Sequence, residues 1–279
     1  MDNNIVDFAV FGNPISHSKS PIIHDIFSKN HNINKNYTSF LVFEKNFFSI
    51  LDSFFENFGK GANITAPFKE HAFIYSDFIT RNAKISGSVN TFKKLENGKI
   101  LGDNTDGIGL LYDLKRIKFL KKNCNILLLG AGGVVRGILE PLLSLGNSIY
   151  ILNRTTKKSE KLKVQFSKYG SIEILNKENK KNIIFDLVIN ATPLGSIKDF
   201  SSLLNDVIHP NINCYDICYQ LESLTPFLFF CRKRFVNSCY DGIGMLVAQA
   251  AYSFLLWHGI LPEIDSVIST LKKEHKKNI

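Results

Sequence analysis

Short apolar runs and longer segments with helical spacing alternate along the first half of the chain. The apolar runs at 5–11, 37–43 and 62–66 predict strands, because each is rich in residues that favour a pleated, half-buried surface. Residues 22–27 and 46–58 carry apolar side chains at helical spacing and predict helices. Strands that alternate with helices in this way predict an α/β fold.

Two local signals refine this half of the chain. Asn97-Gly98 lies between residues 88–92, which mix polar and apolar side chains, and residues 99–101, and this dipeptide predicts a hairpin closed by a type I′ turn. Ser20 followed by Pro21 predicts the start of the helix over 22–27, with Ser20 as its cap. The same serine, together with Ser18, could also help to cradle an anion at the helix N-terminus.

The second half begins with an apolar strand over 124–129, which runs into a glycine-rich turn and then a helix over 138–145. A strand, a glycine turn and a helix in this order form a dinucleotide-binding fingerprint. In that fingerprint Gly130 makes the turn, and Gly132 allows close approach of a pyrophosphate to the helix amides. Further strands are predicted at 149–152, 186–190 and 213–218, followed by a long apolar helix over 245–257 and a last helix after Pro262. The fold class is therefore two-domain α/β, with an N-terminal α/β domain followed by a Rossmann-type doubly wound domain.

The residues after strand 149–152 indicate which dinucleotide is bound. An NAD-binding protein usually places an acidic side chain here, against the ribose hydroxyls. This chain instead has Asn153, Arg154, Thr155 and Lys158. A guanidinium and an ammonium suit a 2′-phosphate, so the sequence predicts NADP.

The stretch 102–107 lies between the two halves and carries four small polar side chains and two glycines. Thr105 or Asp106 would cap the helix predicted over 108–114. Lys69 follows the strand 62–66, at the end of a strand where open α/β sheets bind ligands. Taken singly, Asp106 is an ordinary cap and Lys69 an ordinary solvated lysine.

The composition is typical of a globular protein. The 279 residues are 44% hydrophobic, which is enough to form a core in each of about two domains. No apolar run reaches the roughly 18 residues of a membrane span, and the N-terminus lacks a signal-peptide pattern, so a cytoplasmic location is expected. The five cysteines are odd in number and form no CxxC pair, which predicts reduced, buried thiols and no metal site.

The net charge of +9 is spread along the chain, and only the tail 272–277 forms a basic cluster. That cluster is typical of a solvated helix end rather than a nucleic-acid contact. Dispersed positive charge favours small anionic ligands.

Seven sequence blocks occur in the order found in shikimate dehydrogenases, and the chain resembles that family over nearly its whole length. The blocks are residues 18–21 (SKSP), 63–69 (NITAPFK), 87–91 (GSVNT), 102–107 (GDNTDG), 130–133 (GAGG), 153–155 (NRT) and 241–250 (DGIGMLVAQA).

The resemblance implies reversible NADPH-dependent reduction of 3-dehydroshikimate to shikimate, on the route to chorismate and the aromatic amino acids. Lys69 and Asp106 match the family's catalytic pair, and which of the two gives the proton is left open. The implied substrate-binding residues are Ser18, Ser20, Thr65, Lys69, Asn90, Asp106, Tyr219 and Gln249. The implied cofactor-binding residues are Gly130, Ala131, Gly132, Gly133, Asn153, Arg154, Thr155, Lys158, Ala191, Thr192, Ile217 and Gly242.

The expected organisation is a substrate domain formed by 1–105 and 239–279, an NADP domain formed by 106–238, and an active site in the cleft between them. The expected partner is a small-molecule substrate, without metal, nucleic acid or membrane, and the chain would be a monomer or homodimer. Two alternatives stay open: a quinate/shikimate dehydrogenase that uses NAD, and a non-catalytic dinucleotide-sensing regulator on the same scaffold.

Overall fold

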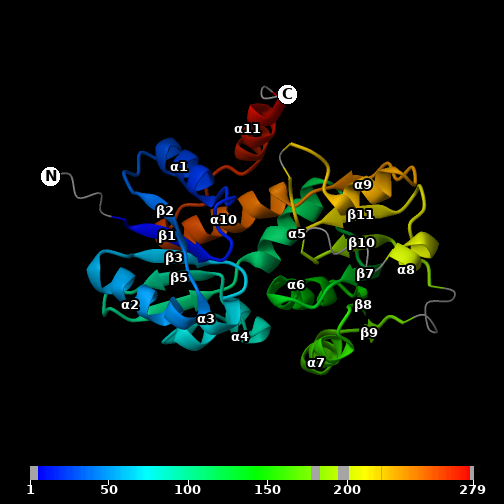
Figure 1. The fold of residues 1–279 in the computed structure, drawn as a ribbon, viewed down its shortest axis with the longest axis horizontal. Helices are drawn as coiled ribbons and strands as arrows, with labels where there is room; N and C mark the ends of the chain where they lie inside the picture. The colour runs from blue at the N-terminus through cyan, green and yellow to red at the C-terminus, as the bar shows by residue number, and fades with distance from the viewer. Residues whose placement is uncertain (1–5, 177–182, 194–200, 221, 277–279) are drawn as a thin grey trace. The chain divides into compact units, whose positions relative to one another are not determined.

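The computed structural model describes residues 6–176, 183–193, 201–220 and 222–276 (Figure 1). The chain divides into two compact units. Unit 1 comprises Met1–Gly109 and Leu246–Ile268, and unit 2 comprises Leu110–Met245 and Ser269–Ile279. Each unit contains its own sheet and helices, so the predicted α/β class is confirmed. The division into a substrate domain (1–105 and 239–279) and an NADP domain (106–238) stays a prediction.

Unit 1 is built on a six-stranded mixed sheet. Its strands are β1 (Phe8–Gly12), β2 (Tyr37–Leu41), β3 (Gly61–Ile64), β4 (Phe78–Ile79), β5 (Thr91–Lys94) and β6 (Ile100–Asp103). The spatial order is β2-β1-β3-β5-β6-β4. Strands β1, β2 and β3 run parallel, β5 runs antiparallel to both β3 and β6, and β4 runs parallel to β6.

The helices that begin in the first segment of unit 1 are α1 (Ser20–Asn30), η1 (Glu44–Asn46), α2 (Phe47–Asn57), α3 (Lys69–Tyr75), α4 (Arg81–Ser86) and α5 (Asp106–Arg116). Helix α2 packs Phe47 and Leu51 against Phe11, Ile64 and Phe92 of the sheet, and all five side chains are buried. This apolar layer fixes the strands, so the residues that follow their ends have defined positions.

Two local predictions in unit 1 are wrong. Helix α1 begins at Ser20, and Lys19 occupies the cap position without a side-chain capping bond. In the hairpin, the Gly98 N–H donates to the Leu95 carbonyl, and Gly98 has φ +80° whereas Asn97 does not have positive φ. This is a type I turn followed by a left-handed glycine, because a type I′ turn needs positive φ at both central residues.

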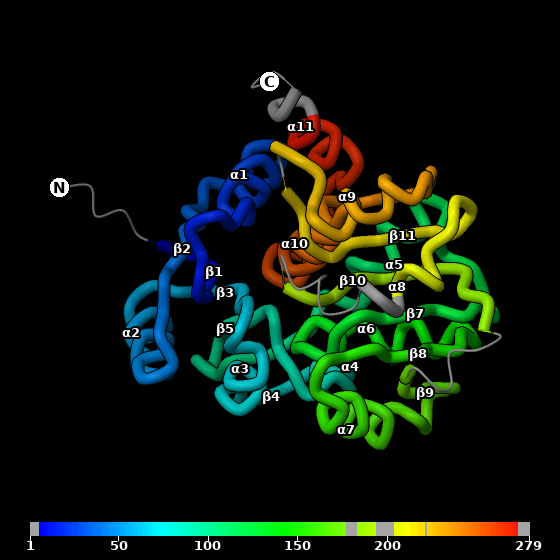
Figure 2. Tube along the Cα trace, turned by 45° about the vertical axis from the view of Figure 1, so that its right-hand side comes forward, coloured from blue at the N-terminus to red at the C-terminus, as the bar shows by residue number. Residues whose placement is uncertain are grey.

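The described residues of unit 2 form six parallel strands in the order β12-β11-β10-β7-β8-β9, of which β11 to β9 are labelled in Figure 2. They are β7 (Asn125–Leu129), β8 (Ser148–Leu152), β9 (Ile172–Ile174), β10 (Leu187–Asn190), β11 (Asn213–Asp216) and β12 (Cys239–Tyr240). Read from β9, this is the Rossmann order 3-2-1-4-5-6. The strand order reverses between β7 and β10, which is where such sheets bind dinucleotides.

The remaining helices are α6 (Gly133–Leu143), α7 (Thr156–Phe166), η2 (Ser167–Tyr169), α8 (Ser201–Val207), α9 (Pro226–Arg232), α10 (Ile243–His258) and α11 (Asp265–Lys276). Helices α8 and α9 cover the sheet face that carries Leu127, Val188 and Cys214. Within the described parts of the chain, no helix is long and apolar enough to cross a membrane. Of the basic tail, residue 277 lies outside the described residues.

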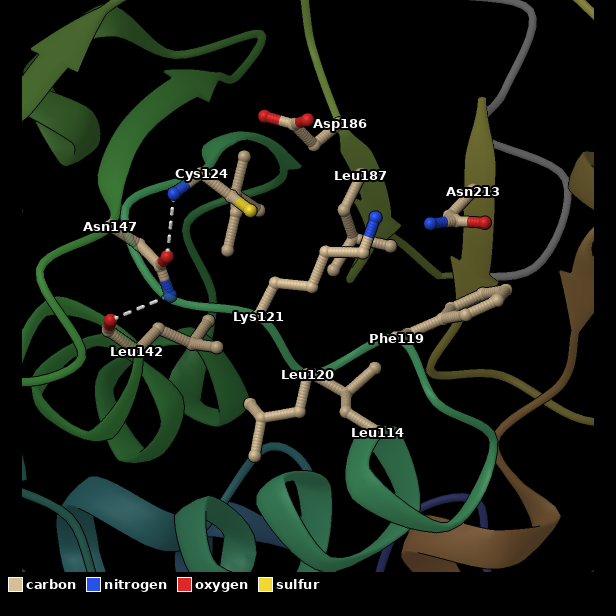
Figure 3. Close-up of a pocket in the computed structure, with 11 residues that line it drawn as sticks. Leu114, Phe119, Leu120, Lys121, Cys124, Leu142, Asn147, Asp186, Leu187 and Asn213 are labelled. Atoms are coloured by element: carbon tan, nitrogen blue, oxygen red, sulfur yellow. Dashed lines mark hydrogen bonds between the residues drawn. The ribbon is translucent and has the colours of Figure 1, made fainter. Parts of the chain in front are cut away.

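A small cavity of about 10 Å³ lies beside the first residues of β7, β10 and β11 (Figure 3). Its lining includes Leu114, Cys124, Leu187 and Asn213. That volume holds roughly one water molecule. It also lies where these strands begin, whereas ligands of such sheets bind where the strands end. The cavity is therefore not a candidate substrate site.

Candidate active site

Four segments of unit 1 meet at one edge of its sheet. The C-terminal ends of β1 and β3 lie at this edge because the two strands are parallel. Strand β5 begins there and β6 ends there, since the antiparallel register places Asn63 opposite Thr91 and Thr91 opposite Asp103. The residues just outside these strands, among them Lys69, Asn90 and Asp106, are thereby brought together.

Lys69 and Asp106 form a largely buried ion pair. The Lys69 Nζ lies 2.6 Å from Asp106 Oδ2, and the two side chains are 14% and 5% exposed. Each residue is the first of its helix, α3 for Lys69 and α5 for Asp106. A carboxylate in the first turn of a helix interacts favourably with the helix dipole. The two predicted catalytic side chains are therefore in direct contact.

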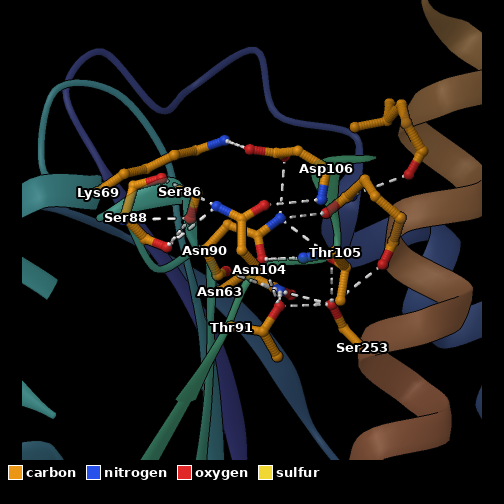
Figure 4. A network of polar contacts seen from close by, with 12 residues as sticks. Asn63, Lys69, Ser86, Ser88, Asn90, Thr91, Asn104, Thr105, Asp106 and Ser253 are labelled. Atoms are coloured by element: carbon orange, nitrogen blue, oxygen red, sulfur yellow. Dashed lines mark hydrogen bonds and ion pairs between the residues drawn. The ribbon is translucent and has the colours of Figure 1, made fainter. Parts of the chain in front are cut away.

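Asn90 holds the carboxylate of this pair in place (Figure 4). Its Nδ2 donates to Asp106 Oδ1 at 2.9 Å, so both carboxylate oxygens accept a hydrogen bond. Its Oδ1 accepts from the Thr105 N–H and from the Thr91 hydroxyl, each at 2.9 Å. Asn90 is 2% exposed. Its amide orientation is therefore fixed by partners at both ends.

Helix α10 contributes two polar side chains to the same network. Gln249 Oε1 lies 3.4 Å from Asn90 Nδ2, while Gln249 Nε2 donates to the Leu246 carbonyl of its own helix. One turn later, Ser253 Oγ lies 2.8 Å from Thr91 Oγ1 and accepts from Asn63 Nδ2 at 3.0 Å. Ser253 was missed by sequence reasoning, although its four-residue spacing from Gln249 places both on one helix face.

The predicted serines join the network through Tyr37. Ser18 Oγ accepts from the Ser20 N–H at 3.3 Å, and Ser20 hydrogen-bonds to Tyr37. The Tyr37 hydroxyl donates to Asn63 Oδ1 at 2.8 Å, and burial raises the pKa of Tyr37 well above its ordinary value. Tyr37 therefore stays a hydrogen-bond donor. Thr65 lies at the same edge, directly after β3, and its N–H bonds to the Phe11 carbonyl.

Asn104 is a further residue that sequence reasoning left out of the site. Its Oδ1 accepts from the Asp106 N–H at 3.1 Å, and its Nδ2 donates to the Ser88 carbonyl. This side chain therefore supports the start of α5 from the preceding loop. Its position inside the block 102–107 was the available signal, but only the fold shows which atoms it contacts.

In unit 2, the glycine turn after β7 has the geometry of a phosphate-binding loop. Gly130 has φ +105°, and a Cβ there would lie 3.0 Å from the Ala191 carbonyl oxygen, so only glycine fits without strain. Gly132 precedes α6 without a side-chain cap, and a Cβ there would meet nothing within 4 Å. The half-buried Ala131 separates them, and Gly133 begins the helix. The first backbone amides of the eleven-residue helix α6 therefore have no side-chain cap and face open space, and such a helix N-terminus suits the negative charge of a pyrophosphate.

The segment after β8 carries the basic residues. Asn153 Nδ2 donates to the Thr155 carbonyl at 2.9 Å, which shapes the turn into α7. Arg154, Thr155 and Lys158 are exposed at the start of this helix, whose first turn has no acidic residue. Positive side chains and helix amides together attract an anion, so these residues fit a phosphate group.

The segments after β10 and β11 are joined by a buried network. Thr192 Oγ1 donates to Asn190 Oδ1 at 2.6 Å, and Asn190 Nδ2 donates to Asp216 Oδ1 at 3.0 Å. Burial raises the pKa of Asp216 to about 6. The Ile217 N–H donates to the Asn190 carbonyl at 2.8 Å. This network fixes the loops beside the switch point between β7 and β10.

Gly242 approaches the backbone of this region closely. A Cβ at Gly242 would lie 2.0 Å from the Ile217 carbonyl oxygen, so this position requires glycine. Ala191 immediately precedes Thr192, and the half-buried Tyr219 lies two residues after Ile217. The structure thus places Ala191, Thr192, Ile217 and Gly242 around one end of the unit 2 sheet.

Comparison with known proteins agrees with this geometry. Residues 10–92 match the shikimate dehydrogenase substrate binding domain, residues 114–198 match shikimate / quinate 5-dehydrogenase, and residues 242–272 match the shikimate 5′-dehydrogenase C-terminal domain. The crystal structure of shikimate dehydrogenase from Aquifex aeolicus is 30% identical with a TM-score of 0.86, and the match covers 97% of this chain and 98% of that one. The chain belongs to the shikimate dehydrogenase family.

Two further solved structures are similar over almost their whole length. An Ael1 enzyme from Pseudomonas putida is 35% identical with a TM-score of 0.80, over 95% of this chain and 98% of that one. Shikimate 5-dehydrogenase from Thermus thermophilus, in complex with NADP(H) and shikimate, is 28% identical with a TM-score of 0.82, over 98% of this chain and 100% of that one. The family consists of oxidoreductases that act on a CH–OH group, which confirms the predicted enzyme class.

Proposed function

We propose that this chain catalyses the reversible NADPH-dependent reduction of 3-dehydroshikimate to shikimate, on the route to chorismate and the aromatic amino acids. The observation that carries the proposal is the Lys69–Asp106 pair, held at 2.6 Å and oriented by Asn90. Such a fixed, shielded proton-transfer group is what carbonyl reduction requires. The Thermus thermophilus relative crystallised with NADP(H) and shikimate supports both ligands.

The geometry favours Lys69 as the proton donor. Hydride addition to a ketone leaves an alkoxide, which needs a donor about 3 Å away. The Lys69 ammonium has three N–H groups and uses one for Asp106, whereas both oxygens of Asp106 already accept hydrogen bonds. Lys69 therefore gives the proton in reduction, and Asp106 holds the Lys69 ammonium in position. In oxidation the Lys69 amine takes the proton back. The nicotinamide supplies or accepts the hydride.

The remaining side chains bind and position the ligands in this proposal. Ser18 and Ser20 hold the substrate carboxylate at the start of α1, and Thr65, Asn90, Tyr219 and Gln249 contact the ring substituents. Residues 130–133 hold the pyrophosphate at the open N-terminus of α6. Asn153, Arg154, Thr155 and Lys158 hold the 2′-phosphate, while Ala191, Thr192, Ile217 and Gly242 face the nicotinamide end. Unit 1 is thus the substrate unit and unit 2 the NADP unit.

A steady-state assay of the purified full-length protein tests this function. Shikimate and quinate are each offered with NADP⁺ and with NAD⁺, and reduced cofactor is followed by absorbance. We expect the highest kcat/KM for shikimate with NADP⁺, because Arg154 and Lys158 suit a 2′-phosphate.

Two other outcomes of this assay would each support an alternative function. Higher efficiency with quinate and NAD⁺ would identify a quinate/shikimate dehydrogenase that uses NAD. NADPH binding without turnover of either substrate would contradict an enzyme function and favour a dinucleotide-sensing regulator.

A further inference from the structure

Three of the five cysteines converge in unit 2, although they are scattered in the sequence. Cys214 lies on β11, Cys231 on α9 and Cys239 on β12. Their Sγ atoms all lie within 4.8 Å of one another. Cys214 and Cys231 have no exposed surface, and Cys239 is partly exposed. The register of the two strands places Cys214 directly opposite Cys239.

The spacing of these sulfur atoms is close to that of a metal site. With metal–sulfur bonds of about 2.3 Å, three thiolates lie about 4.0 Å apart in a plane and about 3.8 Å apart in a tetrahedron. The sulfur atoms here, within 4.8 Å of one another, need to move by less than about 1 Å to reach either arrangement. Side-chain rotation alone can provide such a movement.

Charge distinguishes between the ions that thiolates bind. Three thiolates with a divalent ion leave one negative charge, whereas a monovalent ion leaves two. Arg232 lies beside the cluster, since its guanidinium and the Cys239 Sγ both donate to the Val236 carbonyl oxygen. Arg232 is an exposed residue at the rim of the cluster, and its positive charge can offset one negative charge there, so a divalent ion suits the site better than a monovalent ion. Soft sulfur ligands select thiophilic ions.

We propose that Cys214, Cys231 and Cys239 form a binding site for a thiophilic divalent cation of the Zn²⁺ type. The partly exposed side at Cys239 gives the ion its entry path and leaves room for water as a fourth ligand. The bound ion joins β11, α9 and β12. Strand β11 leads into Ile217 and strand β12 leads towards Gly242, so the ion also stabilises these two segments. Their place beside the nicotinamide rests on the proposed function, whereas the metal site itself does not.

Metal titration of the full-length protein tests the proposal. The chain is treated with a chelator and kept reduced with a phosphine, and Cd²⁺ or Zn²⁺ is then added. We expect one ion per chain, a cadmium–thiolate absorption band, and release of protons on binding. Cys239→Ser and Cys231→Ser should weaken binding at least 100-fold. Cys124→Ser is the matched control, because Cys124 is a buried thiol outside the cluster, and it should bind as the parent does.

Unchanged binding in Cys239→Ser, or an equal loss in Cys124→Ser, would overturn the proposal. A measurement on the unaltered protein covers the case in which the variants fail to fold. X-ray absorption of the zinc-loaded chain should show three sulfur neighbours at about 2.3 Å. A shell of only nitrogen and oxygen, or no retained zinc, would show that the three thiols are only core packing.

Discussion

The two units present their candidate sites in different ways. At the sheet edge of unit 1, the site consists of side chains that bind one another, and Asn90 reaches partners at Asp106 and Gln249, 16 and 159 residues away. At the sheet edge of unit 2, the glycine turn offers backbone: a left-handed Gly130 and the uncapped start of α6. Because the side chains of the unit 1 site bind one another, removing any one of them should disturb the others. The unit 2 site consists of backbone amides, so it should be disturbed mainly by substitutions that change the backbone conformation or fill the open space.

The largest expected effect comes from removing the proton donor of unit 1. Lys69→Ala should lower kcat about 1000-fold, equivalent to about 4 kcal/mol, because general acid catalysis contributes roughly 10²- to 10⁴-fold. Shikimate and NADPH dissociation constants, measured by calorimetry, should change little. Lys45→Ala, which removes an exposed lysine of the same unit, serves as the control. Equal losses in shikimate binding and in turnover would make Lys69 only a binding residue.

The second effect comes from the buried amide that orients Asp106. Asn90→Ala leaves the Thr105 N–H and Asp106 Oδ1 without this partner, so the free energy of unfolding should fall by about 1 to 3 kcal/mol. Urea denaturation measures this loss, and kcat should fall as well. Asn57→Ala, on the exposed face of α2, should change stability by less than about 0.5 kcal/mol. A drop in stability with unchanged kcat would show that Asn90 does not position Asp106.

The third effect tests the backbone site of unit 2. Gly132→Ala adds a methyl group in open space at φ −89°, so the melting temperature should stay unchanged. The methyl group would lie where the pyrophosphate must approach, and the dissociation constant for NADPH should rise about tenfold, equivalent to about 1.4 kcal/mol. Unaltered NADPH affinity would place the pyrophosphate elsewhere. Shikimate binding by the variant is the internal control.

The smallest effect concerns pH and a buried histidine of unit 1. Burial lowers the pKa of His24 to about 3, below the 6.5 of a solvated histidine, so the unfolded chain takes up this proton and the folded chain does not. Stability should fall by about 1 kcal/mol between pH 6.5 and 5.5 from this residue. His24→Phe should remove that part of the slope in denaturation series, whereas the exposed His209→Phe should retain it. Identical slopes in all three proteins would contradict the assignment.

Much of the fold follows from local sequence signals. The α/β alternation, the hairpin and the strand–glycine–helix unit were all predicted, because periodicity and turn residues act over a few neighbouring positions. The details that failed were the exact turn type and the exact first residue of a helix. Gly98 alone takes positive φ in the hairpin, and Lys19 rather than Ser20 precedes α1. Such backbone alternatives differ by little in local energy, so turn and cap residues indicate where an element ends better than they indicate its terminal geometry.

The sequence by itself determined the family, the Rossmann-type unit and the residue types at both candidate sites. Only the tertiary structure decided which atoms meet: Asn90 with Asp106, Ser253 with Thr91, and the sulfur atoms of Cys214, Cys231 and Cys239. The reason is physical. A glycine turn is a property of consecutive residues, whereas a hydrogen bond or thiol cluster between distant segments exists only once strand order and register have brought their ends to the same place.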